Sequence, residues 1–293
     1  MHRLLTGPLT TETVSIPIQN LAAALDGLTL VQLSDFHYDG YRLSEALLQA
    51  AIAQTNALHP DLIFLTGDFV TYDPQPAYAL AQQLRHLKST YGTYAILGNH
   101  DLYQGNSRRV VTTALTQADI SVLWNQIVYP VGPDLPVVGL ADFWTQEFKP
   151  RPLLDWLDPN TPRIVLSHNP DSAEVLKTWR VDLQLSGHTH GGQIVLPGIG
   201  PVPAALRQFR HYVPRWLREY LPYMSDRCAK VVKHWEWAAG LIQVGSNQLY
   251  VNRGLGTYLP GRLFCPPEIT VITLRASPQL TSPSLLSANC LPG

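Results

Sequence analysis

Five short polar clusters in this chain carry side chains that bind divalent metal ions. They are Asp35-Phe36-His37, Gly67-Asp68, Gly98-Asn99-His100-Asp101, Ser167-His168-Asn169 and Gly187-His188-Thr189-His190. Together they contain five of the ten histidines of the chain. Imidazole nitrogens and the oxygens of Asp and Asn suit hard or borderline divalent metals. The last cluster is the most specific, because alternating histidines in a glycine-rich turn serve neither packing nor solubility.

The clusters offer more ligands than one ion needs. The candidates are Asp35, His37, Asp68, Asn99, His168, His188 and His190. A single zinc site takes roughly four ligands, whereas this larger set suits two ions about 3.5–4 Å apart. The Asp68 carboxylate has two oxygens and can bridge both ions. Two ions that close acidify a water between them and offset charge on a phosphate, so the residues predict a two-metal hydrolytic centre.

The elements that position the first three clusters alternate between strands and helices. Helical periodicity covers 43–58, with Ser44 as a plausible N-cap, and 77–87. Three apolar runs, each ending at a cluster, are predicted to be buried strands: 28–33, 61–65 and 94–97. This βαβ rhythm predicts a parallel sheet with helices outside. Open α/β sheets place their sites at the carboxyl ends of such strands.

The pattern is looser in the second half of the chain. Apolar runs at 164–166 and 183–185 precede the fourth and fifth clusters, and helices are expected at 110–118 and 153–157. Further strands are expected at 120–123, 127–129, 137–140, 249–251 and 269–274. Residues 276–293 are rich in Ser, Pro and Leu without a period, and we expect them to form a disordered tail.

Composition excludes several classes of protein. The 293 residues, 45% of them hydrophobic, can bury a large core. A net charge of −1 speaks against a nucleic-acid partner, whose binding domain is normally basic. Three cysteines lack the spacing of a zinc module or a disulfide framework. No signal peptide and no run of ~18 apolar residues is evident, so we expect a cytoplasmic protein, with peripheral membrane contact left open.

One segment, 201–240, differs in charge from the rest of the chain. It carries seven Lys/Arg against three acids, hence +4, which leaves −1 − 4 = −5 for the remainder. It also holds three of the seven tryptophans. Pro214 should kink or restart its helix. The segment is either a solvated helical excursion packed on the domain or a cap that touches anionic lipid or a lipid-linked substrate.

The ordered motifs resemble the calcineurin-like metallophosphoesterase superfamily. Its order is Asp-x-His, Gly-Asp, Gly-Asn-His-Asp/Glu, a lone His, then Gly-His-x-His, and the resemblance covers roughly residues 28–274. Four phrases are similar to a bacterial subgroup, the YkuE/YaeI-type phosphodiesterases, which are related to enzymes acting on UDP-diacylglucosamine. The phrases are LSDFHYDG at 33–40, GDFVT at 67–71, LSHNPD at 166–171 and YVNRGLGT at 250–257.

This resemblance implies a fold and a metal centre. The fold is a four-layer α-β-β-α sandwich in one α/β domain, residues 1–275, with 201–240 as a helical, basic-aromatic cap insertion. One ion is held by Asp35, His37, Asp68 and His190, and the other by Asp68, Asn99, His168 and His188. The ions are typically Mn²⁺, Fe or Zn²⁺. The implied reaction on a phosphoester substrate is in-line attack by a hydroxide that bridges the two ions.

The resemblance also implies catalytic roles, with two departures. His100 is expected to face the leaving group as a general acid rather than to bind metal. Thr71 stands where many members have the acid that orients this histidine, so Asp101 or another partner must orient it. No arginine follows at Tyr72. Since a dianionic monoester benefits most from that cation, its absence favours diesters or pyrophosphates.

Three functions stay open at this point, and a fourth, a nucleic-acid nuclease, is disfavoured by the missing basic charge. The first is a phosphodiesterase, and the second is a UDP-diacylglucosamine-type pyrophosphate hydrolase acting on a lipid-linked precursor. The third, a non-catalytic scaffold of the same fold, is disfavoured because every metal position is filled. Asn169 and Arg253 are candidates for the substrate-facing surface.

Overall fold

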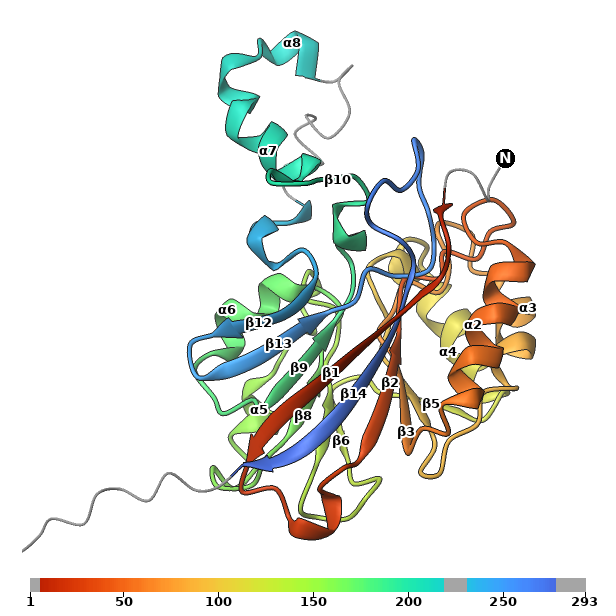
Figure 1. Cartoon of the computed structure of the whole chain (residues 1–293). Helices are drawn as coiled ribbons and strands as arrows, with labels where there is room; N and C mark the ends of the chain where they lie inside the picture. Colours follow the sequence, from red (N-terminus) through yellow and green to blue (C-terminus); the bar gives the residue numbers. More distant parts are fainter. Residues whose placement is uncertain (1–5, 219–230, 278–293) are drawn as a thin grey trace, which may run out of the picture.

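Two six-stranded mixed sheets pack face to face in this protein (Figure 1). The computed structural model describes residues 6–218 and 231–277. The first sheet has the order β1 (Thr10–Gln19), β14 (Glu268–Ser277), β2 (Thr29–Leu33), β3 (Leu62–Leu65), β4 (Thr93–Ala95) and β5 (Ile120–Val122). The second has the order β12 (Gly240–Val244), β13 (Asn247–Val251), β9 (Leu183–Ser186), β8 (Ile164–Leu166), β7 (Val137–Gly139) and β6 (Gln126–Val128).

The central strands of each sheet run parallel. In the first sheet β2, β3, β4 and β5 pair in parallel, and β14 is antiparallel to β2. In the second sheet β7, β8, β9 and β13 pair in parallel, whereas β6 and β12 are antiparallel edges. The predicted parallel βαβ region is therefore confirmed. Parallel pairing brings the carboxyl ends of successive strands to one edge, where loops can meet.

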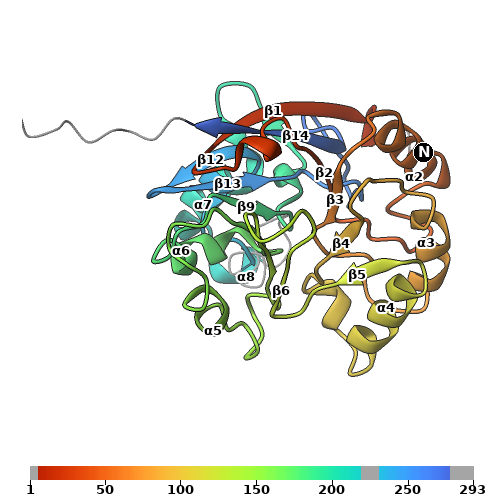
Figure 2. The ribbon, with the colours of Figure 1, turned by 90° about the horizontal axis from the view of Figure 1, so that it is seen from below.

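Helices cover the outer faces of both sheets, as Figure 2 shows. The first sheet is covered by α2 (Glu45–Ala57), α3 (Ala77–Leu84) and α4 (Ser107–Thr116), and the second by α5 (Arg151–Leu154) and α6 (Ala173–Leu176). Ser44 caps α2 as predicted, its side chain accepting a hydrogen bond from Leu47 N. The expected α-β-β-α order of layers is thus present.

The buried strands divide their side chains between two cores. In β3, Leu62 and Phe64 join the core between the sheets, whereas Ile63 and Leu65 join the core under the helices. Successive side chains of a strand point to opposite faces. A strand covered on both faces is therefore mostly apolar, as Leu62–Leu65 of β3 is, and the one polar residue at the centre of β2, Gln32, is buried and hydrogen-bonded.

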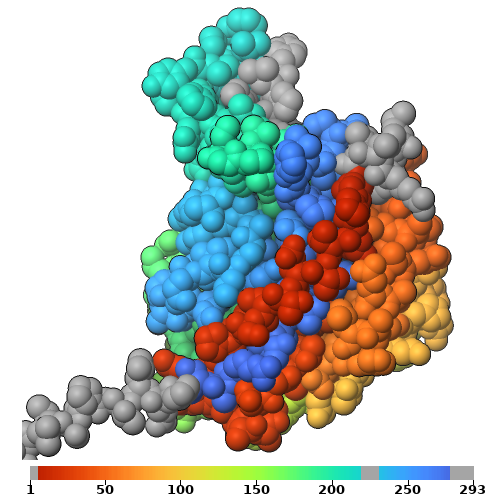
Figure 3. Space-filling model, viewed as in Figure 1, coloured from red at the N-terminus to blue at the C-terminus, as the bar shows by residue number. Residues whose placement is uncertain are grey.

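Strand β1 was missed by the sequence analysis. Its outer residues are polar and exposed, so only Ile16 and Ile18 are fully buried. Pro17 is tolerated because β1 is an edge strand, where a missing N–H costs little. Figure 3 shows β1 beside β14 on the surface. β14 itself extends through Ser277, two residues into the predicted tail, and the predicted tail beyond that lies outside the described residues.

The basic segment begins after a small hairpin, β10 (Val195–Leu196) and β11 (Gly200–Pro201). It forms α7 (Val202–Phe209) and α8 (Arg215–Arg218), which project from the end of the body in Figure 1. The helix stops before Pro214 and restarts after it, as the sequence predicts. Positions 219–230 of the predicted cap lie outside the described residues. No helix in the described ranges is long and apolar enough to cross a membrane.

Candidate metal centre

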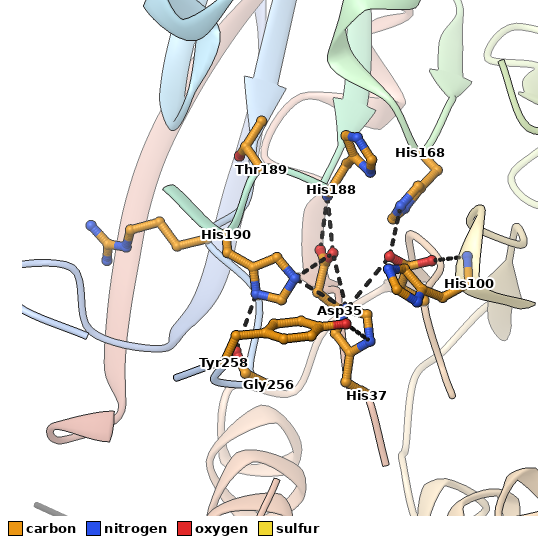
Figure 4. A network of polar contacts seen from close by, with 12 residues as sticks. Asp35, His37, His100, His168, His188, Thr189, His190, Gly256 and Tyr258 are labelled. Carbon is orange, nitrogen blue, oxygen red and sulfur yellow. Dashed lines mark hydrogen bonds and ion pairs between the residues drawn. The ribbon is translucent and has the colours of Figure 1, made fainter. Parts of the chain in front are cut away.

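All five clusters lie in the turns directly after strands. They follow β2, β3, β4, β8 and β9, so the first three come from one sheet and the last two from the other. Figure 4 shows six of their side chains converging from these turns, namely Asp35, His37, His100, His168, His188 and His190. Below them, buried Gln32 donates to Thr66 Oγ1 and to Ser186 O, each at 2.9 Å, and so joins the two sheets. The site is therefore built across the interface of the two sheets.

Several residues of these turns have an uncommon backbone conformation. Asp35, His37, Asp68, His188 and His190 all have positive φ, between 43° and 72°. Non-glycine residues avoid this left-handed region, and they persist there only where surrounding structure fixes them, often at functional sites. These are five of the seven predicted metal ligands, so backbone strain and ligand chemistry coincide at these positions.

Two glycines allow the turns to approach closely. A Cβ on Gly187 would lie 2.0 Å from Ser34 Oγ and 2.3 Å from Asp35 Oδ2. A Cβ on Gly98 would lie 2.3 Å from Asp68 Oδ1. Any side chain at either position would push a candidate ligand carboxylate out of place.

The first ligand group consists of Asp35, His37 and His190, all buried. His37 Nε2 and His190 Nε2 face each other at 3.1 Å, and His190 Nε2 lies 3.4 Å from Asp35 Oδ1. The Asp35 carboxylate is held from behind by His188 N, at 3.0 and 3.1 Å from its two oxygens. Two ring nitrogens aimed at one point beside a carboxylate suit a divalent cation.

The second ligand group consists of Asp68, His168 and His188. His168 Nε2 lies 3.1 Å from Asp68 Oδ2, and the same oxygen lies 3.5 Å from His37 Nε2 of the first group. His188 Nδ1 and Asn99 Oδ1 are buried and have no hydrogen-bond partner among the described residues. Buried polar atoms without partners are costly, and a cation would satisfy both. The residues present therefore fit two ions around Asp68.

Each ligand histidine is oriented through its other ring nitrogen. His168 Nδ1 donates to Thr66 O at 2.6 Å, and His188 Nε2 donates to Val231 O at 3.0 Å. The remaining contacts are His190 Nδ1 to Gly256 O at 3.2 Å and His37 Nδ1 to the Tyr258 hydroxyl at 3.1 Å. A ring N–H used in this way leaves the lone pair of the other nitrogen facing the site, as metal-ligating histidines require.

Electrostatics prepare the same groups for cations. Burial lowers the pKa of His188 to about 4 and keeps the pKa of His37 and of His190 well below the usual range. Burial alone would raise the pKa of Asp68, but the surrounding imidazoles hold it well below its ordinary value. Two groups depart from this pattern: at His168 burial is outweighed by Asp68 and the pKa rises to about 10, and at Asp35 burial raises the pKa to about 6. Neutral imidazoles beside an ionised carboxylate are the forms that bind metal.

His100 lies at the mouth of the site. Its backbone N–H donates to Asp68 Oδ1 at 2.9 Å, and its Nδ1 lies 2.8 Å from Thr71 O. A carbonyl of Thr71 thus replaces the carboxylate that the sequence analysis expected there. His100 also falls within ligand distance of His37 and Asp68, close to the candidate metal positions.

Asp101 does not orient His100, and this part of the sequence interpretation is corrected. Its buried carboxylate accepts from the backbone N–H groups of Asp68, Phe69, Val70 and Gly98, at 2.9 to 3.2 Å. These bonds join the turn after β3 to the turn after β4. A carboxylate is the natural acceptor for several converging amides.

The two candidate substrate residues are also engaged elsewhere. Arg253 pairs with Glu12 at 2.6 Å and with Glu268 at 2.9 Å, which ties β1 to the loop before β14. Asn169 is fully buried, and its Oδ1 accepts from Asp171 N at 2.9 Å. These contacts fix both side chains, while Asn169 Nδ2 is buried without a hydrogen-bond partner among the described residues. Their role toward a substrate stays a prediction.

Sequence reasoning missed Tyr258 and the orienting carbonyls. Tyr258 lies on the loop between β13 and β14, and the Arg42 guanidinium stacks over its ring at 4.5 Å. Tyr258 directly follows the phrase at 250–257, which resembles the family. That position in the sequence was the signal that could have identified it. The carbonyls had no signal at all, because every residue has one.

The comparisons with known proteins agree with this geometry. The calcineurin-like phosphoesterase family model matches residues 28–192, and the chain belongs to this family of metallophosphoesterases. Among curated proteins it is similar to phosphodiesterase YaeI of Escherichia coli, with 35% identity over 83% of this chain and 80% of the relative. It is 35% identical to the uncharacterized metallophosphoesterase YkuE of Bacillus subtilis, over 86% of this chain and 80% of the relative.

Two further comparisons extend this result. UDP-2,3-diacylglucosamine pyrophosphatase LpxG of Chlamydia muridarum is 28% identical, over 85% of this chain and 84% of that protein. A dimetal phosphatase structure from Danio rerio superposes with a TM-score of 0.50 and 11% identity, covering 85% of this chain and 93% of the other. The latter supports the fold alone.

Proposed function

We propose that this protein is a dimetal phosphodiesterase. The observation that carries the proposal is the pair of buried ligand groups that meet at Asp68 Oδ2. Asp35, His37 and His190 would hold one ion, and Asn99, His168 and His188 the other, with Asp68 shared. The donor set of imidazoles, carboxylates and an amide suits Mn²⁺, Fe or Zn²⁺. The similarity to phosphodiesterase YaeI supports the diester as substrate class.

Two such ions would activate a water for in-line attack on phosphorus and offset the charge of the phosphate. The side chains of this protein contribute the rest. Asp68, held by His100 N at 2.9 Å, keeps the two ligand groups together. His100, whose Nδ1 bonds Thr71 O, directs its Nε2 away from that carbonyl and can give a proton to the leaving oxygen.

A pyrophosphate hydrolase is the second candidate function. It is favoured by the similarity to LpxG and by the absence of an arginine at Tyr72, since both diesters and pyrophosphates carry less charge per phosphorus than a monoester. The same ligand groups would serve either reaction. A non-catalytic scaffold would have no need of a complete set of oriented ligands.

A metal-reconstitution experiment tests the proposal. Protein stripped by chelator is reloaded with Mn²⁺, Zn²⁺ or Fe²⁺ and assayed on a monoester, a diester and a pyrophosphate. Asn99→Ala and His188→Ala should lose metal, measured by mass spectrometry, together with diester turnover. His86→Ala, at an exposed histidine, is the matched control. Full activity in both ligand variants would refute the metal assignment, and turnover of the pyrophosphate alone would favour the second candidate.

A further inference from the structure

Large apolar side chains are exposed on three segments near the metal centre. These segments are the β10–β11 hairpin, the α7–α8 region and the loop between β13 and β14. Ile199 lies in the hairpin, Phe209 and Trp216 in the helical region, and Leu259, Leu263 and Phe264 in the loop; their exposed fractions run from 48% to 83%. We call these six side chains the apolar end face. Scattered exposed apolar residues are normal, but a concentration of this kind marks an interaction surface.

Backbone hydrogen bonds join the three segments into one framework. Val195 N donates to Leu263 O and Leu263 N donates to Gln193 O, each at 2.9 Å. At the start of α7, Val202 N donates to Ile194 O at 2.8 Å. Figures 1 and 3 show the helices and the loop at the same end of the molecule. The hairpin, the start of α7 and the loop are therefore fixed to one another, although the exposed residues of the loop lie more than forty residues beyond Trp216 in the chain.

Positive charge lies beside this face. Arg207, Arg210, His211 and Arg218 line a hollow of about 340 Å³ on the helical region. Arg207 is held by Val232 O at 3.0 Å, and Arg218 by Val213 O at 2.7 Å, so both side chains are fixed at the hollow. Residues 202–218 contain four arginines and no acid, whereas the chain outside 201–240 is acidic.

We infer that the apolar end face docks on an anionic lipid bilayer. Apolar and aromatic side chains that protrude from loop and helix ends enter the boundary of headgroups and acyl chains, while nearby arginines attract lipid phosphates. The apolar parts lie on a hairpin, a loop and a short helix rather than in one groove, which suits a deformable bilayer. The acidic remainder of the chain would stay in water, so the charge distribution sets one orientation on the surface.

This surface leads directly to the metal centre. Tyr258 precedes Leu259 of the apolar end face and its hydroxyl lies 3.1 Å from His37 Nδ1. At the other end of the loop, Cys265 Sγ donates to His190 O at 3.4 Å. A protein seated on lipid by this face would hold its ligand groups close to the headgroup layer. On the proposed function, the substrate class is therefore a phosphodiester or pyrophosphate carried by a lipid.

Vesicle sedimentation tests the docking surface with the full chain. The wild type should sediment with vesicles that contain phosphatidylglycerol and remain in solution with pure phosphatidylcholine. Leu263→Ser/Phe264→Ser and, separately, Trp216→Ser should each weaken binding by roughly ten-fold or more. Trp156→Ser is the matched control, since Trp156 is 79% exposed but lies outside the face; it should bind like the wild type.

Turnover of a soluble chromogenic diester separates this inference from the proposed function. The face variants should keep that turnover and lose only vesicle binding and turnover of a diester lipid in vesicles. Unchanged vesicle binding in the face variants would overturn the docking inference while leaving the metal centre intact. Self-association of the wild type without vesicle binding, abolished by the same substitutions, would also overturn it in favour of a protein contact. If the metal-loaded wild type does not hydrolyse the soluble diester, the proposed function is refuted instead.

Discussion

Asp101→Asn distinguishes the structural role of this carboxylate from the catalytic one that the sequence suggested. The side chain accepts two backbone N–H bonds on each oxygen: Phe69 and Val70 on Oδ1, and Asp68 and Gly98 on Oδ2. Asparagine is nearly the same size but replaces one oxygen with an NH₂ group. Two buried N–H groups would then face a donor in place of an acceptor.

The magnitude follows from those two lost acceptors. A buried donor without a partner costs roughly 1–3 kcal/mol, so Asp101→Asn should lower the free energy of unfolding by roughly 2–6 kcal/mol. That is a large part of the roughly 5–15 kcal/mol typical of a folded domain. Because the broken bonds hold the Asp68 turn, we also expect weaker metal binding.

Urea unfolding followed by circular dichroism measures the effect, on metal-free protein and again after metal loading. Asp134→Asn, at an exposed aspartate, is the control for the chemical change itself and should leave the midpoint unchanged. A variant as stable as the wild type to within about 0.5 kcal/mol, a typical surface effect, but deficient in turnover would refute the structural role. That result would instead support a catalytic role for Asp101.

Three other perturbations follow from the site. Tyr258→Phe removes the acceptor of a ligand-histidine N–H, so calorimetry should show Mn²⁺ affinity falling by roughly ten-fold or more. Gly187→Ala puts a carbon 2.0 Å from Ser34 Oγ, so metal content and thermal stability should both fall. Burial would raise the pKa of Asp39, but backbone N–H bonds from Arg42 and Tyr41 hold it below its ordinary value. Asp39→Asn should therefore destabilise the protein at neutral pH, and in urea unfolding the difference should shrink as the pH falls below the ordinary range of an aspartate.

Each of these perturbations has an outcome that contradicts its reason. Unchanged Mn²⁺ affinity in Tyr258→Phe would show that the hydroxyl does not orient the ligand. If the Gly187→Ala protein is as stable as the wild type and binds metal equally well, the turn can move to accept a Cβ without loss of stability. A carboxyl group whose pKa is lowered by folding stabilises the protein at pH values above its unfolded-state pKa, and this stabilisation is lost as the pH falls. A stability difference between the wild type and Asp39→Asn that grows on acidification would therefore contradict the lowered pKa of Asp39.

The sequence predicted the parallel core because its elements are strongly patterned. The runs before Asp35 and Asp68 are apolar except at Thr29, Gln32 and Asp61, and such runs are typical of strands covered on both faces. The edge strand β1 lacks this signal because half of its side chains face water. The ion pairs of Arg253 had no signal for a related reason: its partners, Glu12 and Glu268, lie 241 and 15 residues away, and no local pattern indicates such a contact.

The candidate metal ligands could be predicted from the sequence for a reason that does not apply to the groups that orient them. A side-chain ligand is one of a few residue types, such as His, Asp or Asn, so a candidate appears in the sequence. The orienting groups of three candidate ligand histidines are instead backbone carbonyls. Thr66 O, Val231 O and Gly256 O would be present with any side chain. His100 follows the same rule, since Thr71 O accepts from its Nδ1. The absent carboxylate at Thr71 therefore left no gap in the structure: the peptide bond of the same residue supplies the acceptor, so a missing acidic side chain in this motif does not by itself indicate a missing catalytic contact.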